Sequence, residues 1–436
     1  MNIYNYQEAF GASDKTSRAM KKAVKAWFEM YFQQEREKNS DPCQRIAYTV
    51  VHKITKAVFS EYRAVCDESA VATWLRALEA RKKEAMQLAL VGGECYIKPC
   101  PNGMGFSYTL IPRNHVLIFG RDSHGEPTDV GLMEKSTLGK YYYTLLERRS
   151  VDKHGVLTIR NRLFRSVSRE NLGQETDLRE HPQYRSLPKV WKSTVGSVGL
   201  VRMKTPMVNC VDGSMDAVAV FAPATQLIYA IDRNEAQLAG EFERGQSRVF
   251  LSRDLLDRDG NLSDNLFVGL DEDPQTVGMT VFAPQLREQS FLARKQEYLR
   301  NVESVVGLKR GMLSDVNMDE RTATEIAASQ ADFSLTVMDF QAMWEEAAVK
   351  TMELCSLLAG IYGMGGGQKA QIRFDWGNGV LYDEEKTWQG YLQMVKEGLI
   401  APEVALGWRF GMPADTQEQR LAIRKKYMPH HIGVSS

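Results

Sequence analysis

The sequence predicts an α+β fold in which helices at both ends of the chain enclose a block of antiparallel strands. Apolar residues recur at helical spacing through the first ninety residues and again between about 287 and 362. In between, from Gly93 to about 215, short runs rich in β-branched and aromatic residues alternate with turn clusters. Strands do not alternate with helices there, so a parallel nucleotide-binding sheet is not expected.

Three helices are expected at the N-terminal end. The first lies within residues 15–38, the second begins at Asp41-Pro42, and the third runs from about 69 to 90 and stops at Gly92-Gly93. The apolar faces of the first two consist of Met20, Val24, Trp27, Phe28 and Tyr31, and of Ile46, Val50, Val51, Ile54 and Val58.

Five strands are expected in the middle of the chain, bounded by turn clusters such as PNGMG and DSHGEP. Their sequences are CYIKPC, FSYTLIP, HVLIFG, KYYYTLLERR and VLTIRNRLF. Because no helices separate them, these strands should form an antiparallel sheet.

Long helices are expected in the second half. A helix near 223–244 and another over about 287–310 flank a compact segment, 246–284, which contains two strand-like runs, RVFLS and GMTVFAP. A helix of about 60 Å should follow from 322 to about 362, and the tail should hold one strand, QIRFDW, and two short helices. The stripes of the two flanking helices are narrow and comprise Leu227, Ile231, Leu238 and Phe242, and Phe291, Tyr298, Val302 and Val305.

The charge balance argues against tight DNA binding. Lys+Arg and Asp+Glu both number 55, so the formal net charge is zero, whereas tight DNA binders carry a basic excess that releases counterions from phosphates. The six cysteines are scattered, which favours free thiols in a reducing compartment. No signal peptide or membrane span is expected, and the chain should be made in the cytoplasm.

The acidic segment SDVNMDERTATEIAAS separates the second flanking helix from the long helix. From Asp315 it has the Asp-x-Asn-x-Asp spacing of an EF-hand loop, but Glu320 stands where that loop needs glycine and Ile326 where it needs glutamate. Thr322 and Glu325 match a capping box instead. We therefore expect a polar loop that leads into a capped helix.

The residue patterns do not predict an enzyme. The run GMGGGQK lacks the GxxxxGK[ST] order of a phosphate-binding loop and follows a helix, so a turn is expected. The seven histidines form no HxxxH or HExxH pair. Carboxylate clusters such as Asp271-Glu272-Asp273 could hold a divalent ion for nuclease chemistry, but solvated turns explain them more simply. We expect no catalytic residue, no metal site and no cofactor.

The order of these elements resembles the portal proteins of tailed double-stranded DNA phages, in particular the Gram-positive siphophage type. The resemblance covers roughly residues 90–430, and it is loosest in the clip and crown, which look short. The segments that carry it, in chain order, are YYYTLLERR, VLTIRNRLFRS, VRMKTPMVNCVDGSMDAV, RVFL, FAPQLREQSF, NVESVVGLKRGMLSD, RTATEI and RFDWGNGVLYDEEKTWQGYLQMVKEGLI.

This resemblance implies a phage portal fold that assembles as a ring. Each chain would have a wing of helices and antiparallel strands, a two-helix stem, a small β-containing clip, a long kinked helix and a short crown. The implied boundaries are 1–222 for the wing, 223–245 and 286–313 for the stem helices, 246–285 for the clip, 314–321 for the tunnel loop, 322–363 for the long helix, and 364–436 for the C-terminal wing strand and crown.

The resemblance also implies a function in the virion, at one vertex of the capsid. A ring of usually twelve copies would admit double-stranded DNA during packaging, retain it, and release it during ejection. The terminase large subunit would dock on the clip, and head–tail adaptor proteins would later replace it. The major capsid and scaffold proteins would be further partners.

Three sets of residues are candidates for this function. The channel loop comprises Asp315, Asn317, Met318, Asp319, Glu320 and Arg321; the partner-facing clip residues are Arg253, Asp254, Asp257, Arg258, Asp259 and Asp264; the stem-packing residues are Leu227, Ile231, Leu238, Phe291, Tyr298 and Val302. We expect Arg321 to make transient phosphate contacts that neighbouring acids keep weak. Truncation of Phe291, expected to be buried, should cost about 3–5 kcal/mol and perturb assembly.

Two other classes of protein remain open from the sequence. A helical scaffold protein without a DNA channel would use the same stripes internally, and a metal-dependent nuclease would use the Asp clusters. Rings many times heavier than the 49.3 kDa chain would distinguish the portal interpretation from the scaffold, and a plasmid-nicking assay with Mg²⁺ or Mn²⁺ would test the nuclease.

Overall fold

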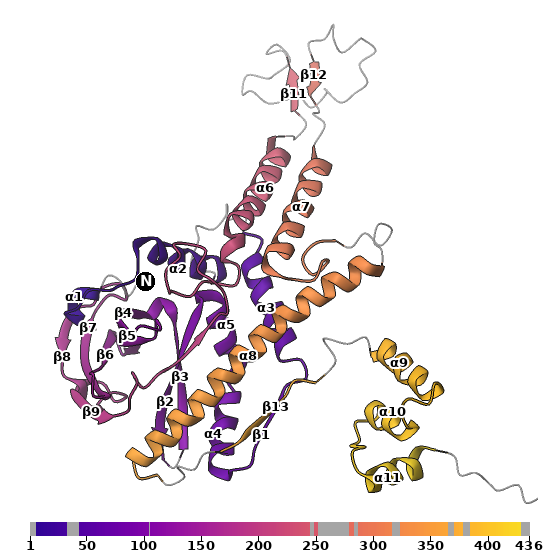
Figure 1. Ribbon diagram of the computed structural model, residues 1–436. Coiled ribbons are helices and arrows are strands. Elements are labelled where there is room, and N and C mark those ends of the chain that lie inside the picture. Colours follow the sequence, from indigo (N-terminus) through magenta and orange to yellow (C-terminus); the bar gives the residue numbers. More distant parts are fainter. Residues whose placement is uncertain are drawn as a thin grey trace, which may run out of the picture.

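The computed structural model is a mixed body of helices and strands from which two helices project together (Figure 1). It describes residues 6–32, 43–103, 105–244, 248–251, 279–282, 287–315, 323–364, 370–377 and 384–428. The expected α+β class is confirmed.

The N-terminal helices form much of the main apolar core. They are α1 (Gln7–Phe10), α2 (Arg18–Tyr31), α3 (Ile46–Val58), α4 (Ser69–Glu79) and α5 (Lys82–Gly92). All ten residues expected on the apolar faces of the first two predicted helices are buried, in α2 and α3. The helical spacing therefore identified the inward faces correctly.

Two predicted helix boundaries are wrong. The second predicted helix begins at Ile46, not at Asp41-Pro42, because Arg45 has a left-handed backbone, with φ at 57°, which a helix cannot continue through. The third is divided into α4 and α5 at Ala80 and Arg81. Arg81 donates to the carbonyl of Tyr108 at 2.6 Å, which ties the break to the neighbouring sheet.

The strands of the middle region form two antiparallel sheets. The strands are β2 (Glu94–Asn102), β3 (Gly105–Pro112), β4 (Val116–Arg121), β5 (Pro127–Leu138), β6 (Tyr141–Val151), β7 (Val156–Ser166), β8 (Gln174–Thr176), β9 (Val190–Thr194) and β10 (Val201–Lys204). One sheet has the order β10-β2-β3, and the other has the order β4-β5-β6-β7-β8 with β9 also paired to β7. The five predicted strands are all present.

The strand β5 was not predicted, although it pairs with β6 from Asp129 to Leu138. Gly131 lies in its interior, where glycine weakens a strand signal. A Cβ at this position would lie 2.9 Å from the ring of Phe10 and 2.9 Å from that of Phe119. The glycine is thus required by the two aromatic rings that pack over it.

The projecting pair, which we call the stem, consists of α6 (Thr225–Arg244) and α7 (Glu288–Val306). The strands β11 (Arg248–Leu251) and β12 (Met279–Phe282) pair with each other at its far end (Figure 1). These four elements match the predicted helix–strand–strand–helix order. The second stem helix ends at Val306, a few residues earlier than predicted.

The long helix α8 (Ala323–Ile361) runs along the body and packs against α3, α4, β2 and β10. It is continuous, and Figure 1 shows no sharp bend in it, so the kink implied by the resemblance is not seen here. Predicted core residues of this helix such as Phe340 and Trp344 are buried, whereas Ile361 is exposed.

The described residues of the C-terminal part form one strand and three helices, where two helices were predicted. The strand β13 (Ile372–Asp375) pairs antiparallel with β1 (Arg63–Cys66), a short strand that was not predicted. The helices are α9 (Glu384–Lys396), α10 (Pro402–Arg409) and α11 (Gln417–Tyr427), and α10 packs against both of the others.

Candidate functional site

The segment between β10 and α6 connects the body to the stem, and it follows a closely fitted path. Gly93 accepts a hydrogen bond at 2.9 Å from the amide of Thr205, whose hydroxyl donates to the carbonyl of Val218 at 2.8 Å. Gly93 has φ at 82°, and a Cβ there would lie 2.5 Å from the backbone of Ala217 and Val218. Only glycine fits, because both the backbone angle and the contact exclude a side chain.

The turn at the centre of this segment is built on Asn209. Its Oδ1 accepts from the amides of Val211 at 2.8 Å and Asp212 at 3.2 Å. Its Nδ2 donates to Asp212 Oδ1 at 2.9 Å and to Ser214 Oγ at 3.0 Å. The side chains of NCVDGS therefore hold their own backbone in place, which explains why Asn, Asp and Ser occur together. The hydroxyl of Ser17 also donates to Asp212, so the turn is tied to the start of α2.

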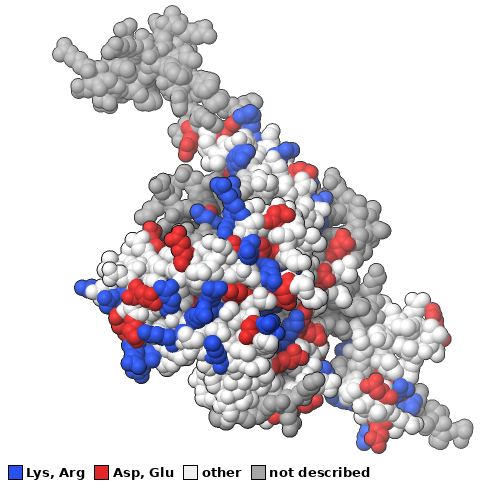
Figure 2. All heavy atoms as spheres, turned by 60° about the vertical axis from the view of Figure 1, so that its left-hand side comes forward, with Lys and Arg blue, Asp and Glu red and all other residues white. Residues whose placement is uncertain are grey.

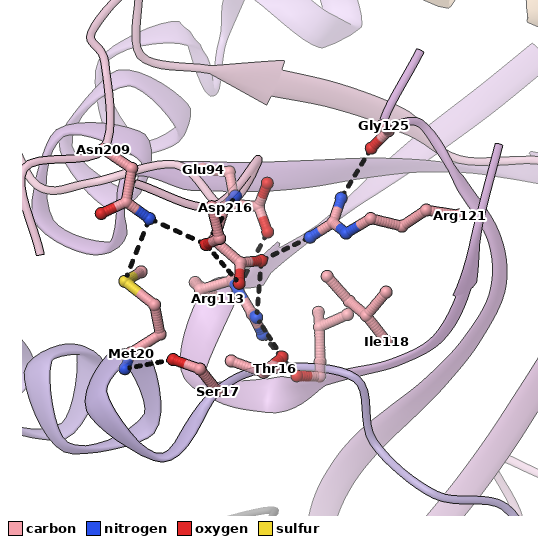
Figure 3. A network of polar contacts seen from close by, with 12 residues as sticks. Thr16, Ser17, Met20, Glu94, Arg113, Ile118, Arg121, Gly125, Asn209 and Asp216 are labelled. Carbon is pink, nitrogen blue, oxygen red and sulfur yellow. Dashed lines mark hydrogen bonds and ion pairs between the residues drawn. The ribbon is translucent and has the colours of Figure 1, made fainter. Parts of the chain in front are cut away.

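A buried ionic network lies beside this turn (Figure 3). Glu94 is fully buried, and its two carboxylate oxygens pair with Arg113 Nε at 2.9 Å and Arg202 Nε at 2.5 Å. Asp216 pairs with Arg121 and lies 3.6 Å from Arg113 Nη2. We call these five residues the junction network.

The junction network joins distant parts of the chain. Arg113 is itself fully buried, and it donates to the carbonyl of Val116 at 2.8 Å and to the hydroxyl of Thr16 at 2.8 Å. The network thus links the residues before α2, both sheets and the segment that leads into the stem. Breaking a buried pair is costly because it leaves an uncompensated charge away from water.

The electrostatics of Glu94 follow from these contacts. Burial by itself raises the pKa of a carboxyl group, but Arg202, Arg113 and Arg121 together outweigh burial and lower the pKa of Glu94 to about 2. The same balance holds for Glu147 in β6, where Arg149 and Lys98 lower the pKa to about 2. Both carboxylates are therefore ionised at neutral pH.

The two stem helices hold each other by polar contacts along their length. Asn234 donates to the carbonyl of Phe291 at 3.1 Å, and Lys295 pairs with Glu235 at 2.8 Å. Farther out, Arg287 and Glu241 form a two-bond ion pair at 2.7 and 2.9 Å. The stem is therefore a defined helix pair in each chain.

The stem-packing residues divide into two groups. Ile231, Leu238 and Val302 are buried, whereas Leu227 and Tyr298 are only partly buried against the core. The predicted apolar stripes of the two helices also included Phe242 and Val305, which are exposed in the structure.

Phe291 is not fully buried, which corrects its predicted role. It lines a groove of about 390 Å³ between α6 and α7, together with Tyr298 and the cationic side chains of Arg233, Arg287 and Arg294. Its truncation should therefore cost less in the single chain than the predicted range. The fully buried members of the predicted stem-packing set are Ile231 and Val302.

The chain turns back on itself after α7, and Glu303 organises the turn. Its carboxylate is fully buried. Oε1 accepts backbone N–H groups from Gly311 at 3.0 Å, Leu313 at 2.5 Å and Ser314 at 2.9 Å. Oε2 accepts the hydroxyl of Ser314 at 2.8 Å. Residues 311–314 are thereby fixed against α7, immediately before the predicted channel loop.

The predicted functional loops lie largely outside the described residues. Of the channel-loop candidates, Asp315 is described: it is exposed, and its amide donates to Gln296 Oε1 at 2.8 Å. The predicted residues outside the described part are Asn317, Met318, Asp319, Glu320, Arg321, Thr322, Arg253, Asp254, Asp257, Arg258, Asp259 and Asp264. Glu325 lies in α8, but its side chain is also outside the description.

Sequence reasoning missed the charged residues of these sites. No role was predicted for Glu94, Arg113, Arg202 and Glu303. The segment quoted for its resemblance to portal proteins did contain Asn209, Asp212 and Ser214. A signal existed for Glu303, because a carboxylate between Val302 and Val306 interrupts an apolar helix face.

The surface drawn in Figure 2 carries interspersed cationic and anionic side chains, with no large area of one sign. Among the described side chains, His, Cys, Asp and Glu do not gather in groups of three that could hold a metal ion. All six cysteines are free thiols. In the described segments, no helix combines the length and apolar character that crossing a bilayer requires.

A body of helices and antiparallel strands, a projecting helix pair with a hairpin at its end, and a long helix returning along the body together define a portal-type protein. The family model for phage portal proteins of the SPP1 Gp6-like type matches residues 192–425. This match covers more than half of the sequence, and the chain therefore belongs to that family. None of the curated proteins compared with the chain matches it.

Membership in the family has direct implications for the biological setting. It implies an oligomeric ring, association with the capsid, and a location at the portal vertex of the virion. The family is structural and not enzymatic. The sequence-based identification of the chain as a phage portal protein is thus confirmed.

Proposed function

We propose that this protein forms a ring, of twelve copies, that serves as the DNA channel at one capsid vertex during packaging, retention and ejection. In this proposal the terminase large subunit docks on the segment between α6 and α7, and head–tail adaptor proteins later replace it. The observation that carries the proposal is the stem with its terminal hairpin, followed by an anchored turn and α8, all within the residues that the portal family model matches.

The exposed surface of the stem supports contacts between copies. Tyr229, Leu292 and Val305 are between 40% and 48% exposed in the single chain. The groove lined by Phe291 and three arginines is another such surface. Exposed apolar side chains on a projecting helix pair are typical of an interface. In the proposed ring, neighbouring stems cover these side chains.

The charge distribution supports a channel in which DNA slides. The formal net charge is zero, and both signs are mixed on the surface in Figure 2. Strong phosphate contacts would hold DNA in place, because each one adds affinity through counterion release. In this proposal residues 315–321 line the narrowest part of the channel, and Arg321 makes weak phosphate contacts beside neighbouring acids.

The first test is the mass and shape of the purified protein. Mass photometry should give particles of about twelve times the 49.3 kDa chain, and negative-stain electron microscopy should show closed rings with a central opening. A stable monomer or dimer would contradict the proposal and favour a helical scaffold protein.

The second test concerns the loop. A variant that lacks residues 315–320 should still form rings, but phage carrying it should fail to package or retain DNA. The matched control is a deletion of similar length in the tail after residue 428. Normal packaging by the loop variant would overturn the assignment of the loop to the channel.

A further inference from the structure

The carboxylate of Glu303 has an unusual set of partners for a buried charge. Within the described residues, it accepts hydrogen bonds from three backbone amides and one hydroxyl, all contributed by residues 311–314. Hydrogen bonds to an ionised acceptor are about twice as strong as those between neutral groups. The charge therefore stabilises one conformation of this four-residue segment.

The end of α7 does not need this carboxylate. Gly307 adopts a left-handed conformation, with φ at 76°, and its amide donates to the carbonyl of Glu303. The amide of Leu308 donates to the same carbonyl at 2.8 Å. The backbone thus closes the helix by itself. The side chain of Glu303 is free to bind the segment that follows.

The segment that leads into the proposed channel loop is attached to α7. At the start, Ser314 is bound by Glu303 and the amide of Asp315 by Gln296. Farther along the chain, Thr336 in the interior of α8 lies beside Gly307, where an added Cβ would be 2.4 Å from Thr336 Oγ1. The described chain after α7 therefore follows a fixed path as far as Asp315.

From these contacts we propose that Glu303 is the positioning residue that fixes the start of the channel loop on the second stem helix. The inference rests on the proposed function, because the loop acts on DNA only in a ring. Glu303 sets where the loop begins and does not itself touch DNA. Every copy in the ring carries the same attachment, so each channel loop begins at the same position relative to its stem.

Two substitutions distinguish the contribution of the charge of Glu303 from that of its side-chain length. Glu303→Gln keeps the shape and removes the charge, so the four bonds become weaker. Glu303→Asp keeps the charge but is one methylene shorter, so its oxygens no longer reach all four donors. The matched control is Glu297→Gln, which makes the same charge change at an exposed position of α7.

The direct measurement is hydrogen exchange of residues 311–314 in the purified rings. The amides of Gly311, Leu313 and Ser314 should exchange about tenfold faster in Glu303→Gln than in the unaltered protein. Glu303→Asp should change them in the same direction, and Glu297→Gln should leave them unchanged. Phage with Glu303→Gln should yield fewer DNA-filled heads although their rings have the normal subunit number.

Three outcomes would overturn the inference. The first is unchanged exchange in Glu303→Gln, and the second is normal DNA filling despite faster exchange. The third is a failure of Glu303→Gln to form rings while Ser314→Ala, which removes only the hydroxyl donor, leaves exchange of 311–313 unchanged. Failure of the proposed function looks different, because the unaltered protein would then form no rings or the loop deletion would package normally.

Discussion

Glu94 and Glu303 are both fully buried carboxylates, yet the chain compensates their charges in different ways. At the junction network, Glu94 pairs with Arg202 of β10 and with Arg113 of the turn between β3 and β4. After α7, backbone amides and a hydroxyl from one short segment surround Glu303. The first arrangement joins distant parts of the chain, and the second shapes a local turn.

These two kinds of compensation imply different rigidity in the junction network and in the turn after α7. The ion pairs of the junction network connect the segment that leads into the stem with both sheets. Loss of one pair should therefore destabilise the whole body. A turn held by amide dipoles can be disturbed without disturbing the body. We therefore expect substitutions at the junction to affect folding, and substitutions at the turn to affect mainly the loop.

The largest effect is expected for Arg113→Met. It removes the cation that bridges Glu94 and Asp216, and it should lower the free energy of unfolding by about 3–5 kcal/mol. Urea denaturation followed by tryptophan fluorescence measures this change. The control is Arg160→Met, at an exposed position of β7. An equal effect of both substitutions would contradict the role of the junction network.

The second-largest effect is expected from acid, which should weaken the junction network. The pKa of Glu94 is lowered from 4.5 to about 2 in the folded chain, so its stabilisation is present above pH 4.5 and is lost as the pH falls towards 2. The loss corresponds to roughly 3 kcal/mol at full protonation. Urea midpoints measured between pH 7 and 2.5 should fall over this range. The fall should be smaller in Glu94→Gln, and an identical fall would show that other carboxylates are responsible.

The smallest effects are expected at the two glycines that follow helices in these regions. Gly93→Ala would place a Cβ against the backbone of Ala217 and Val218, and should cost about 2–3 kcal/mol. Gly307→Ala would meet the side chain of Thr336, which can rotate away, so about 1–2 kcal/mol from the left-handed backbone remains. Thermal unfolding of both variants gives the order, and the reverse order would show that the junction is not the stiffer region.

Periodic apolar faces were predictable from sequence because every side chain needed for burial lies on the same helix. The inward faces of α2 and α3 are examples. The strand β1 was not predictable in this way, because its partner β13 lies in the last quarter of the chain. Four residues, Arg63–Cys66, carry too little pattern by themselves to distinguish a strand from a turn.

The candidate sites show a similar division. The order of stem, loop and long helix could be predicted from helix periodicity and loop composition. The role of Glu303 could not, because its partners are backbone amides, which every residue possesses and no motif records. The junction network was hidden for another reason. Its charged residues are spread from Glu94 to Asp216, and only the folded sheets bring them together.

The pairing of β1 with β13 also constrains synthesis of the protein. An aromatic group that includes Tyr62 and Trp376, with ring centroids 4.7 Å apart, is completed only when β13 joins β1. A nascent chain still on the ribosome lacks this strand until translation has passed Asp375. Subunits therefore complete this part of the body only after Asp375 has been made, which favours assembly from chains translated at least that far.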